Sequence, residues 1–259
     1  MKYSNMTIKE LDKLIKENRS AENYENIIAE LIQDSRKGVQ NLCKREIRHI
    51  ENIKQKQELS KKMFSVEKRL LDQGFNYIAG IDEAGRGPLA GPVVVASVIL
   101  KSYEVNVLYQ DSKKLSESKR EILYDHIVKN SLSYSIELID QKQIDEINIL
   151  NATFEAMRKS IENLNKKPDY VLVDGNMEIP GLTLMQKNHI GGDENIRVIS
   201  AASILAKVYR DRLMLEYDKK YPLYKFAKHK GYGTQEHISL IKKYGPCEIH
   251  RKSFLGNIL

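Results

Sequence analysis

Two apolar runs separated by a turn rich in Gly and Pro constrain the fold of this chain more than any other feature. The first run covers residues 77–81, the second covers residues 93–100, and the turn between them reads GRGPLAGP. Short apolar runs rich in β-branched residues and bounded by Gly and Pro predict buried strands. We therefore expect a core that contains a sheet and begins near Phe75.

The chain beyond this pair of runs alternates between strand and helix patterns. We predict strands at residues 134–139 and 170–173, and helices at about residues 116–130, 141–164 and 200–221. The first of these helices carries a possible capping box, Ser118-x-x-Glu121. Strands that are followed by alternating strands and helices predict an α/β domain with a mixed sheet.

The first 72 residues have a different composition. They contain no Pro, have no Gly before Gly38 and are crowded with Lys, Glu, Ile and Leu. Apolar residues recur at helical spacing, at Ile8, Leu11, Leu14 and Ile15 and again at Ile27, Ile28, Leu31 and Ile32. Charged residues dominate positions 45–69, which predicts a long, exposed, basic helix. We interpret residues 1–72 as a helical basic extension, either merely solvated or able to hold nucleic acid, and residues 73–259 as the main domain.

The overall charge indicates a polyanionic partner. The net charge is +7 and the pI is about 9.1, which favours nucleic acid or an anionic membrane surface. The sequence has no apolar run near the roughly 18 residues of a membrane span, and its first residues lack the apolar core of a signal peptide. Cys43 and Cys247 lie in different regions without metal-ligand spacing. We therefore expect a cytoplasmic protein with no membrane partner.

Four carboxylates stand at strand ends and in a turn. Asp82 and Glu83 follow the first apolar run, Asp174 follows the strand at 170–173, and Asp193 lies in a Gly-Gly-Asp turn before the last predicted helix. Ionised carboxylates beside buried strands are costly unless they are paired or bind a metal. Clustered carboxylate oxygens suit Mg²⁺ or Mn²⁺, and two such ions catalyse phosphodiester hydrolysis in many nucleases.

Each of these acids also has a simpler interpretation. A single acid at a strand end most often caps a helix or forms a turn, but four of them in a basic chain favour a metal site. One geometric condition applies to the adjacent pair. Neighbouring residues of a strand point to opposite faces, so Asp82 and Glu83 share a site only if the strand ends or bulges there.

The segment Gly85-Arg86-Gly87 directly follows the acid pair. Glycines allow a ligand to approach the backbone closely and leave amide groups free to donate hydrogen bonds. Such donors suit a phosphate or a 2′-hydroxyl, with Arg86 as a charged partner. The alternative is a tight turn without a binding role.

One face of the last predicted helix is a candidate for substrate contact. Its apolar stripe consists of Ala201, Ile204, Leu205 and Val208. Ser203, Lys207 and Arg210 lie on the opposite side, where small and basic groups suit a phosphate backbone. A solvent-exposed face would have the same pattern.

The segment HKGYGTQEH at residues 229–237 is a second candidate. Tyr232 lies between two glycines, where it can stack on a sugar or a base. The alternative is a packed tyrosine in a surface loop. His229 and His237 lack the spacing and the cysteine partners of a zinc site, so we interpret the histidines as scattered.

These segments together resemble bacterial ribonuclease HII, within the ribonuclease-H-like superfamily. The matching segments are GIDEAGRGPLAGPVVVASVIL (80–100), DSKKLS (111–116), VLVDGN (171–176), GGD (191–193), AASILAKVYRD (201–211), HKGYGT (229–234) and HRKSF (250–254). They occur in the family's order from about residue 75 onward. The family's turn before the last acid reads Lys-Gly-Asp, whereas this chain has Gly191 in place of the Lys. Residues 1–72 resemble an extension found in some members.

The resemblance implies a fold, a reaction and site residues. The fold is an α/β ribonuclease-H-like mixed sheet flanked by helices, with a helical C-terminal region. The implied enzyme hydrolyses the RNA strand of RNA/DNA hybrids and nicks DNA duplexes 5′ of single ribonucleotides, leaving 3′-hydroxyl and 5′-phosphate ends. The implied catalytic and metal-binding residues are Asp82, Glu83, Asp174 and Asp193, which hold Mn²⁺ or Mg²⁺. The implied substrate-binding residues are Gly85, Arg86, Gly87, Ser203, Lys207 and Tyr232.

Some alternatives stay open at this stage. Asp211 is a rival for the fourth acid, but it ranks below Asp193 because it lies deep in a predicted helix between Arg210 and Arg212. A structure-specific DNA nuclease of the same superfamily would use a similar acid cluster. A non-catalytic binder of hybrid duplexes would keep the basic groups without needing four acids. We expect a monomer, and the sequence indicates no particular protein partner.

Overall fold

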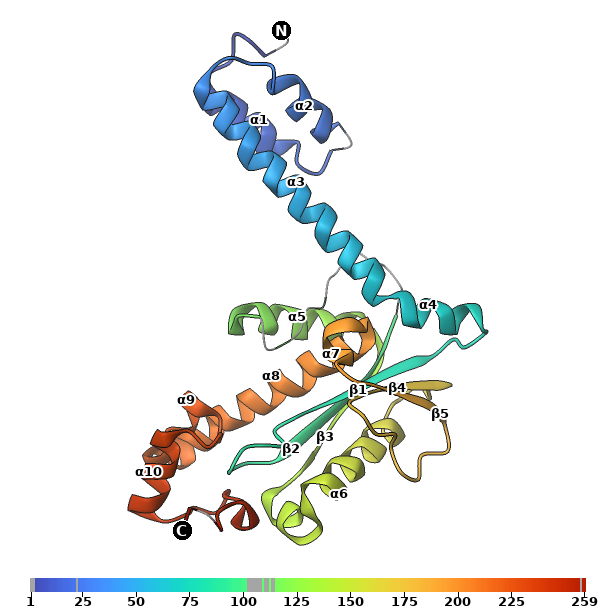
Figure 1. Cartoon of the computed structure of the whole chain (residues 1–259), viewed down its shortest axis with the longest axis vertical. Helices are drawn as coiled ribbons and strands as arrows, with labels where there is room; N and C mark the ends of the chain where they lie inside the picture. The colour runs from blue at the N-terminus through green and yellow to red at the C-terminus, as the bar shows by residue number, and fades with distance from the viewer. Residues whose placement is uncertain (1–2, 22, 102–108, 110–111, 113–114, 257) are drawn as a thin grey trace. The chain divides into compact units, whose positions relative to one another are not determined.

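The computed structural model describes the whole chain except residues 1–2, 22, 102–108, 110–111, 113–114 and 257. Three residues of the DSKKLS segment, at 111, 113 and 114, lie outside the described part. The chain divides into two compact units, residues 1–59 and 60–259 (Figure 1). The sequence-based boundary near residue 72 stays a prediction.

The first unit consists of helices that bury most of the apolar residues predicted at helical spacing, although Ile8 and Ile32 are each 45% exposed. It contains α1 (Ile8–Glu17), α2 (Tyr24–Leu31) and the larger part of α3 (Lys37–Met63). Thr7 and Glu10 form a capping box that begins α1. The core includes Leu11, Ile15, Ile27, Ile28 and Leu31, which pack with Val39 and Cys43 of α3. Helical structure in this region was correctly predicted.

The predicted long basic helix is interrupted. Helix α3 ends at Met63, and α4 (Ser65–Asp72) begins after Phe64. Within α3, residues 51–59 are all exposed, as expected for a charged helix. Burial returns at Ser60 and Met63, and α4 contributes Leu70 to the core of the second unit. The single helix predicted over residues 45–69 is therefore wrong, because its last part packs on a different core.

The second unit is built on a five-stranded mixed sheet with the order β3-β2-β1-β4-β5. Its strands are β1 (Ile78–Ala84), β2 (Val93–Leu100), β3 (Ser131–Ile139), β4 (Tyr170–Asp174) and β5 (Met185–His189). The β1–β2 and β2–β3 pairs are antiparallel, whereas β1–β4 and β4–β5 are parallel. The mixed sheet was predicted. Strand β5 was not, because none of its five side chains is fully buried and the sequence MQKNH is mostly polar.

Helices cover both faces of the sheet (Figure 1). They are α5 (Glu117–Asn130), α6 (Gln141–Glu162), α7 (Gly192–Asn195) and α8 (Arg197–Lys220), followed by the C-terminal elements η1 (Pro222–Tyr224), α9 (Phe226–His229), α10 (Gln235–Tyr244) and η2 (Lys252–Phe254). On one face, α8 packs its predicted stripe against Val94, Ala96 and Val98. On the other, α6 packs against Val93, Val95 and Ile99. The alternation along β2 divides the core into two layers.

Gly80 allows β1 and α8 to approach each other closely. A Cβ atom at this position would lie 2.3 Å from the backbone carbon of Val198 and 2.6 Å from the amide nitrogen of Ile199. Backbone atoms cannot move aside, so only glycine fits here. The beginning of α8 is thereby held against the strand that carries Asp82.

One local prediction for the helices is wrong, and one predicted helix is confirmed as α6 but contains a kink. The side chain that caps α5 is Ser116, whose hydroxyl accepts from the amide of Lys119 at 3.4 Å, so the capping box proposed at Ser118 and Glu121 is not the cap. Ser118 lies inside the first turn. The helix predicted over 141–164 contains a kink at Asn148, where φ is 64° and the side chain caps the segment that follows.

Candidate active site

Three aspartates converge at one edge of the sheet. Asp82 comes from β1, Asp174 from the end of β4 and Asp193 from α7, and one carboxylate oxygen of each lies within 4.8 Å of the others. The parallel pairing of Ile81 with Val173 explains the first two positions, because the next residue on each strand reaches the same edge. Asp82 and Asp193 are only 5% and 4% exposed. Two buried carboxylates and a partly buried one this close together suit a hard cation.

The glycines before Asp193 position that residue against Asp174. Gly191 adopts the left-handed conformation, with φ of 67°, at the start of α7. A Cβ atom on Gly192 would lie 2.6 Å from Ile199 Cδ1 and 3.2 Å from Asp174 Oδ1. The amide of Asp193 donates to the same Asp174 oxygen at 3.2 Å. Gly191 in place of the family's Lys therefore occupies a conformation that glycine adopts without strain.

Glu83 lies beside the three aspartates but outside their group. Strand β1 does not end at residue 81, because Glu83 and Ala84 still pair with Val95 and Val94 of β2. The Glu83 amide donates to Asp82 Oδ1 at 2.7 Å, and its carboxylate accepts from Arg86 at 3.2 Å. Glu83 and Asp82 nevertheless line the same cavity of about 220 Å³. Both residues lie beyond the last pair of β1 with β4, which joins Ile81 and Val173.

The acids of the site raise one another's pKa. Burial raises the pKa of Asp82 well above its usual range, and the charges of Glu83 and Asp174 raise it further. Burial and the charge of Asp193 raise the pKa of Asp174, while backbone amides partly oppose this. Such carboxylates repel one another when ionised. A divalent cation would relieve the repulsion, so the donor set fits Mg²⁺ or Mn²⁺.

The Gly85-Arg86-Gly87 loop is held from behind by a buried arginine. Arg251 is 0% exposed and donates to the carbonyl oxygens of Gly85 at 2.6 Å, Arg86 at 2.8 Å and Gly91 at 2.9 Å. These carbonyls lie in the turn between two strands, outside the strand pairing. The Arg251 guanidinium supplies the hydrogen-bond donors that buried carbonyls need. Arg251 belongs to the HRKSF segment, but the sequence assigned it no role. The Gly- and Pro-rich turn indicates that some side chain must donate hydrogen bonds to its carbonyls. That signal is too general to identify Arg251 as the donor.

Arg210 has a similar role, and its predicted position was wrong. It is 1% exposed and donates to the carbonyl oxygens of Ala90, Pro92 and Lys230 at 3.0 to 3.1 Å. The sequence had placed it on a substrate-facing side of the helix with Ser203 and Lys207. Helix α8 is instead buried on most sides, and the turn between β1 and β2 covers Arg210.

The other predicted substrate-binding side chains line the cavity. Ser203 shares a hydrogen bond of 3.0 Å with Ser112, and its hydroxyl also lowers the pKa of Asp82. Lys207 donates to Asp211 at 2.6 Å. Tyr232 is 43% exposed. All three predicted residues line the cavity together with Gly85 and Arg86, whereas Gly87 does not.

Asp211, the rival acid, lies with cations rather than with the aspartates. Besides Lys207, it faces Arg120 at 4.0 Å. Among the described residues, the carboxylate group that could hold a metal contains Asp193 and not Asp211.

Three histidines pack beneath the loop that carries Tyr232. His237 and His250 share a hydrogen bond of 3.1 Å between their Nε2 atoms, and the ring of His229 stacks on that of His237 at 4.2 Å. His237 Nδ1 bonds to the carbonyl of Tyr232 at 2.9 Å. The histidines are therefore clustered rather than scattered as expected, since η2 and the segment before it fold back against α10.

This cluster predicts a loss of stability in acid. Burial lowers the pKa of both His237 and His250 to about 4, below the ordinary value of 6.5. Between about pH 6.5 and 4 the unfolded chain binds more protons, so the stability present above pH 6.5 is lost as the pH falls. We expect a loss of roughly 3 kcal/mol per histidine across this window.

Denaturant unfolding and NMR titration of the histidine ring protons, both followed from about pH 7.5 to 4.5, check this prediction. An unchanged unfolding free energy, or ring protons of His237 and His250 that titrate near pH 6.5 in the folded chain, would contradict it.

Comparison with known proteins identifies the family. The family model Ribonuclease HII matches residues 79–256, which include the whole candidate site. The chain belongs to the ribonuclease HII family. The model Ribonuclease HII N-terminal domain matches residues 7–71 as well. The resemblance found in the sequence is thus confirmed.

Relatives over most of the chain agree with this assignment. Ribonuclease HII of Clostridioides difficile is 47% identical over 253 residues, covering 98% of both chains. That of Caldicellulosiruptor bescii is 57% identical over 196 residues, covering 76% of this chain and 95% of the relative. The crystal structure of ribonuclease H2 from Pyrococcus horikoshii has a TM-score of 0.59 and 27% identity, covering 69% of this chain and 93% of the other.

These findings support two statements about this ribonuclease HII. The predicted ribonuclease-H-like fold, a mixed sheet flanked by helices with helical additions at both ends, is confirmed. The chain is a ribonuclease H of type HII, a hydrolase of nucleic acid. In the described part of the chain, none of the helices combines the length and the apolar character needed to cross a bilayer.

Proposed function

We propose that this enzyme nicks DNA duplexes 5′ of single embedded ribonucleotides and hydrolyses the RNA strand of RNA/DNA hybrids. The observation that carries the proposal is the cavity in which Asp82 and Asp174 lie beside the Gly85-Arg86 backbone and Tyr232. It combines ligands for hard cations, donors for a 2′-hydroxyl and a ring for a sugar. Only a duplex that contains ribose needs all three.

The carboxylates supply the catalytic centre in this proposal. Asp82, Asp174 and Asp193 would hold the divalent ions, and Glu83 would complete the set from the opposite side of β1. Two bound ions, Mg²⁺ or Mn²⁺, would supply water activation and stabilise the leaving 3′-oxygen, so that 3′-hydroxyl and 5′-phosphate ends result. The amide of Asp193 keeps the Asp174 carboxylate oriented.

The loop and the two helical segments would bind and orient the substrate. The backbone of Gly85 and Arg86 would contact the ribose 2′-hydroxyl and its phosphates, because both residues line the cavity while Arg251 holds their carbonyl oxygens. Ser203 and Lys207 would contact the phosphate backbone. Tyr232 would pack on the deoxyribose that follows the ribonucleotide.

Cleavage of a DNA duplex bearing one ribonucleotide, beside an all-DNA duplex of the same sequence, tests the proposal. Both are incubated with Mg²⁺, with Mn²⁺ and with EDTA. We expect a single nick 5′ of the ribonucleotide that is absent with EDTA and absent from the all-DNA duplex. Equal cutting of both duplexes would indicate a structure-specific DNA nuclease instead. Binding without cutting in either metal would indicate a non-catalytic binding protein.

We also infer that the catalytic function belongs to residues 73–259 and that one chain suffices, since every residue that lines the cavity comes from the second unit. We propose a cytoplasmic location, where the enzyme would serve ribonucleotide excision repair and replication. Both described cysteines are free thiols, which suits a reducing compartment.

A further inference from the structure

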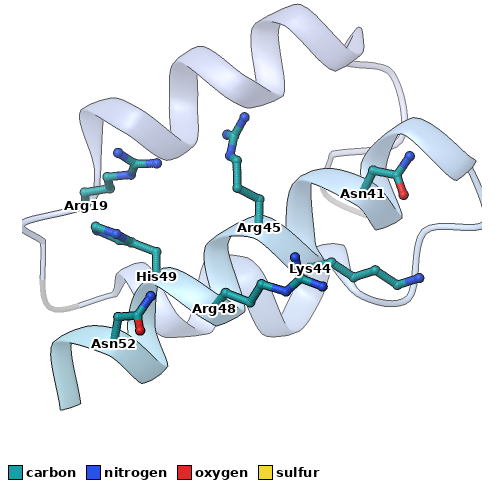
Figure 2. Close-up of a pocket in the computed structure, with 7 residues that line it drawn as sticks. All are labelled: Arg19, Asn41, Lys44, Arg45, Arg48, His49 and Asn52. Carbon is teal, nitrogen blue, oxygen red and sulfur yellow. The ribbon is translucent and has the colours of Figure 1, made fainter. Parts of the chain in front are cut away.

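The first unit carries a basic pocket that takes no part in the site described above. Arg19 and six residues of α3 line it, namely Asn41, Lys44, Arg45, Arg48, His49 and Asn52 (Figure 2). Its volume is about 470 Å³. The six α3 residues are three or four positions apart along two adjacent rows, so they share one side of the helix. We call these seven residues the basic face.

The basic face contains cations and amides but no carboxylate. Four of its members are Lys or Arg, and the others are two Asn and one His. Gln55 and Lys56 follow Asn52 at the same helical spacing, and both are exposed. Helix α3 as a whole contains eight Lys and Arg residues against three Glu. The surface around this pocket is therefore strongly basic.

Two of the arginines are held in place by a buried acid. Glu46 is 0% exposed and accepts from Arg19 at 2.8 and 2.9 Å, from Arg45 at 2.7 Å and from the hydroxyl of Tyr24 at 2.7 Å. These bonds order the two guanidinium groups at the edge of the pocket before any ligand arrives. Pre-ordered donors lose less conformational entropy on binding.

The two other cations of the basic face remain available. Lys44 and Arg48 are exposed, and within the described ranges neither has an acidic partner or a hydrogen bond. Figure 2 shows the side chains of Lys44 and Arg48 both extending along α3, in the direction of Asn41. Charged groups that are exposed, unpaired and next to ordered arginines are suited to bind an anionic ligand.

We propose that the basic face binds the phosphodiester backbone of duplex nucleic acid, separately from the catalytic cavity. The face offers guanidinium, ammonium and amide donors, which are the groups that contact phosphate oxygens without reading sequence. Successive turns of α3 repeat about every 5.4 Å, so several donors can engage neighbouring phosphates of one strand. No Leu, Phe or Trp side chain belongs to the face, which favours nucleic acid over a lipid surface.

This inference rests on the proposed function in one respect, namely that the bound duplex is the substrate of the enzyme. Binding to an all-DNA duplex in EDTA tests it without any chemistry. The informative variant of the full chain is Lys44→Gln with Arg48→Gln. The matched control is Lys9→Gln with Lys13→Gln, which removes the same charge from exposed positions on α1.

We expect the Lys44/Arg48 variant to bind the duplex about tenfold more weakly than the wild type at about 50 mM salt. We also expect the slope of log affinity against log salt to become shallower by about 1 to 2 between roughly 50 and 200 mM, because fewer counterions are released. The control should stay within about twofold of the wild type. A charge-conserving variant, Lys44→Arg with Arg48→Lys, should recover most of the affinity and exclude misfolding as the cause.

Several outcomes would overturn the inference. One is a Lys44/Arg48 variant with the affinity and salt slope of the wild type, and another is an equal loss in the Lys9/Lys13 control. A third is a loss of binding to phosphatidylserine vesicles without a loss of binding to the duplex. Nicking of the ribonucleotide duplex by the wild type is measured separately. Failure of that reaction with intact salt-dependent binding would refute the proposed catalysis and leave this inference standing.

Discussion

Asp174→Asn is expected to lower the rate of nicking by at least about a thousandfold, which corresponds to roughly 4 kcal/mol of transition-state stabilisation. Asp174 lies at the end of β4, where one of its oxygens accepts the amide of Asp193 and its carboxylate faces Asp82 and Asp193. Asn keeps an acceptor for the amide but removes the negative charge. The group of acids would then lose affinity for divalent ions while its backbone arrangement persists.

The same substitution is expected to leave the folded chain as stable as the wild type, or more stable, when no metal is present. Burial and the neighbouring Asp193 raise the pKa of Asp174, so its ionised form destabilises the fold at neutral pH. Removing the charge relieves the desolvation and the repulsion by Asp193 that raise this pKa. Loss of activity together with unchanged or higher stability would separate a catalytic acid from a structural one.

Single-turnover nicking in Mg²⁺ and Mn²⁺, with thermal unfolding in EDTA, checks both parts of this prediction. Asp125→Asn is the control, because its side chain is 78% exposed on α5 and lies 4.0 Å from Arg212, away from the three aspartates. The control should behave as the wild type in both measurements. Nicking by Asp174→Asn within about tenfold of the wild type would remove Asp174 from the catalytic set.

Gly85→Ala is expected to damage both stability and activity. The backbone of Gly85 has φ of 95°, which is unfavourable for any residue with a Cβ atom. The added Cβ would lie 2.1 Å from Arg210 Nε and 2.9 Å from the carbonyl oxygen of Pro92. Arg210 cannot move aside, because its three hydrogen bonds hold it in the turn. We expect a loss of about 3 kcal/mol in unfolding free energy and at least about a hundredfold in activity.

Gly87→Ala provides the matched control for this prediction. Apart from its chain neighbours, no atom of the described residues lies within 4 Å of a Cβ at Gly87, and its φ is outside the left-handed range. Its unfolding free energy should stay within about 0.5 kcal/mol of the wild type, so any change in KM would report on substrate contact alone. The two variants are compared by denaturant unfolding and steady-state nicking. Equal stability of Gly85→Ala and the wild type would contradict the close packing described here.

The sequence predicted the central strands well because continuous apolar runs have few alternatives. Residues 93–100 are buried on both faces and form β2 with the expected bounds. Strand β5 offers no such pattern, since it lies at the edge of the sheet and its side chains are partly exposed. The helix break at Phe64 was not predicted either, because the composition of the chain does not change there. What changes is the packing, since residues 51–59 are exposed and α4 packs on the core of the second unit.

The candidate site was predictable to the extent that strand ends determine it. Asp82 and Asp174 follow apolar runs, and parallel strands bring their ends to one edge. The supports of the site were not predictable in this way. Arg251 reaches Gly85 across 166 positions, and Arg210 reaches Ala90 across 120. Such contacts depend on how the C-terminal segments fold back, which no local pattern encodes.

The distance along the chain between Gly85 and Arg251 has a consequence for biosynthesis. A ribosome that adds about 5–20 residues per second delivers Arg251 roughly 10–30 s after Gly85. During that interval β1 and β2 can pair, and Asp174 and Asp193 can join Asp82. The carbonyls of the Gly85–Arg86 turn, however, still lack their donor. A nascent or prematurely ended chain can therefore bring the acids together before Arg251 holds the loop beside them, so the part of the site that we propose recognises ribose is completed last.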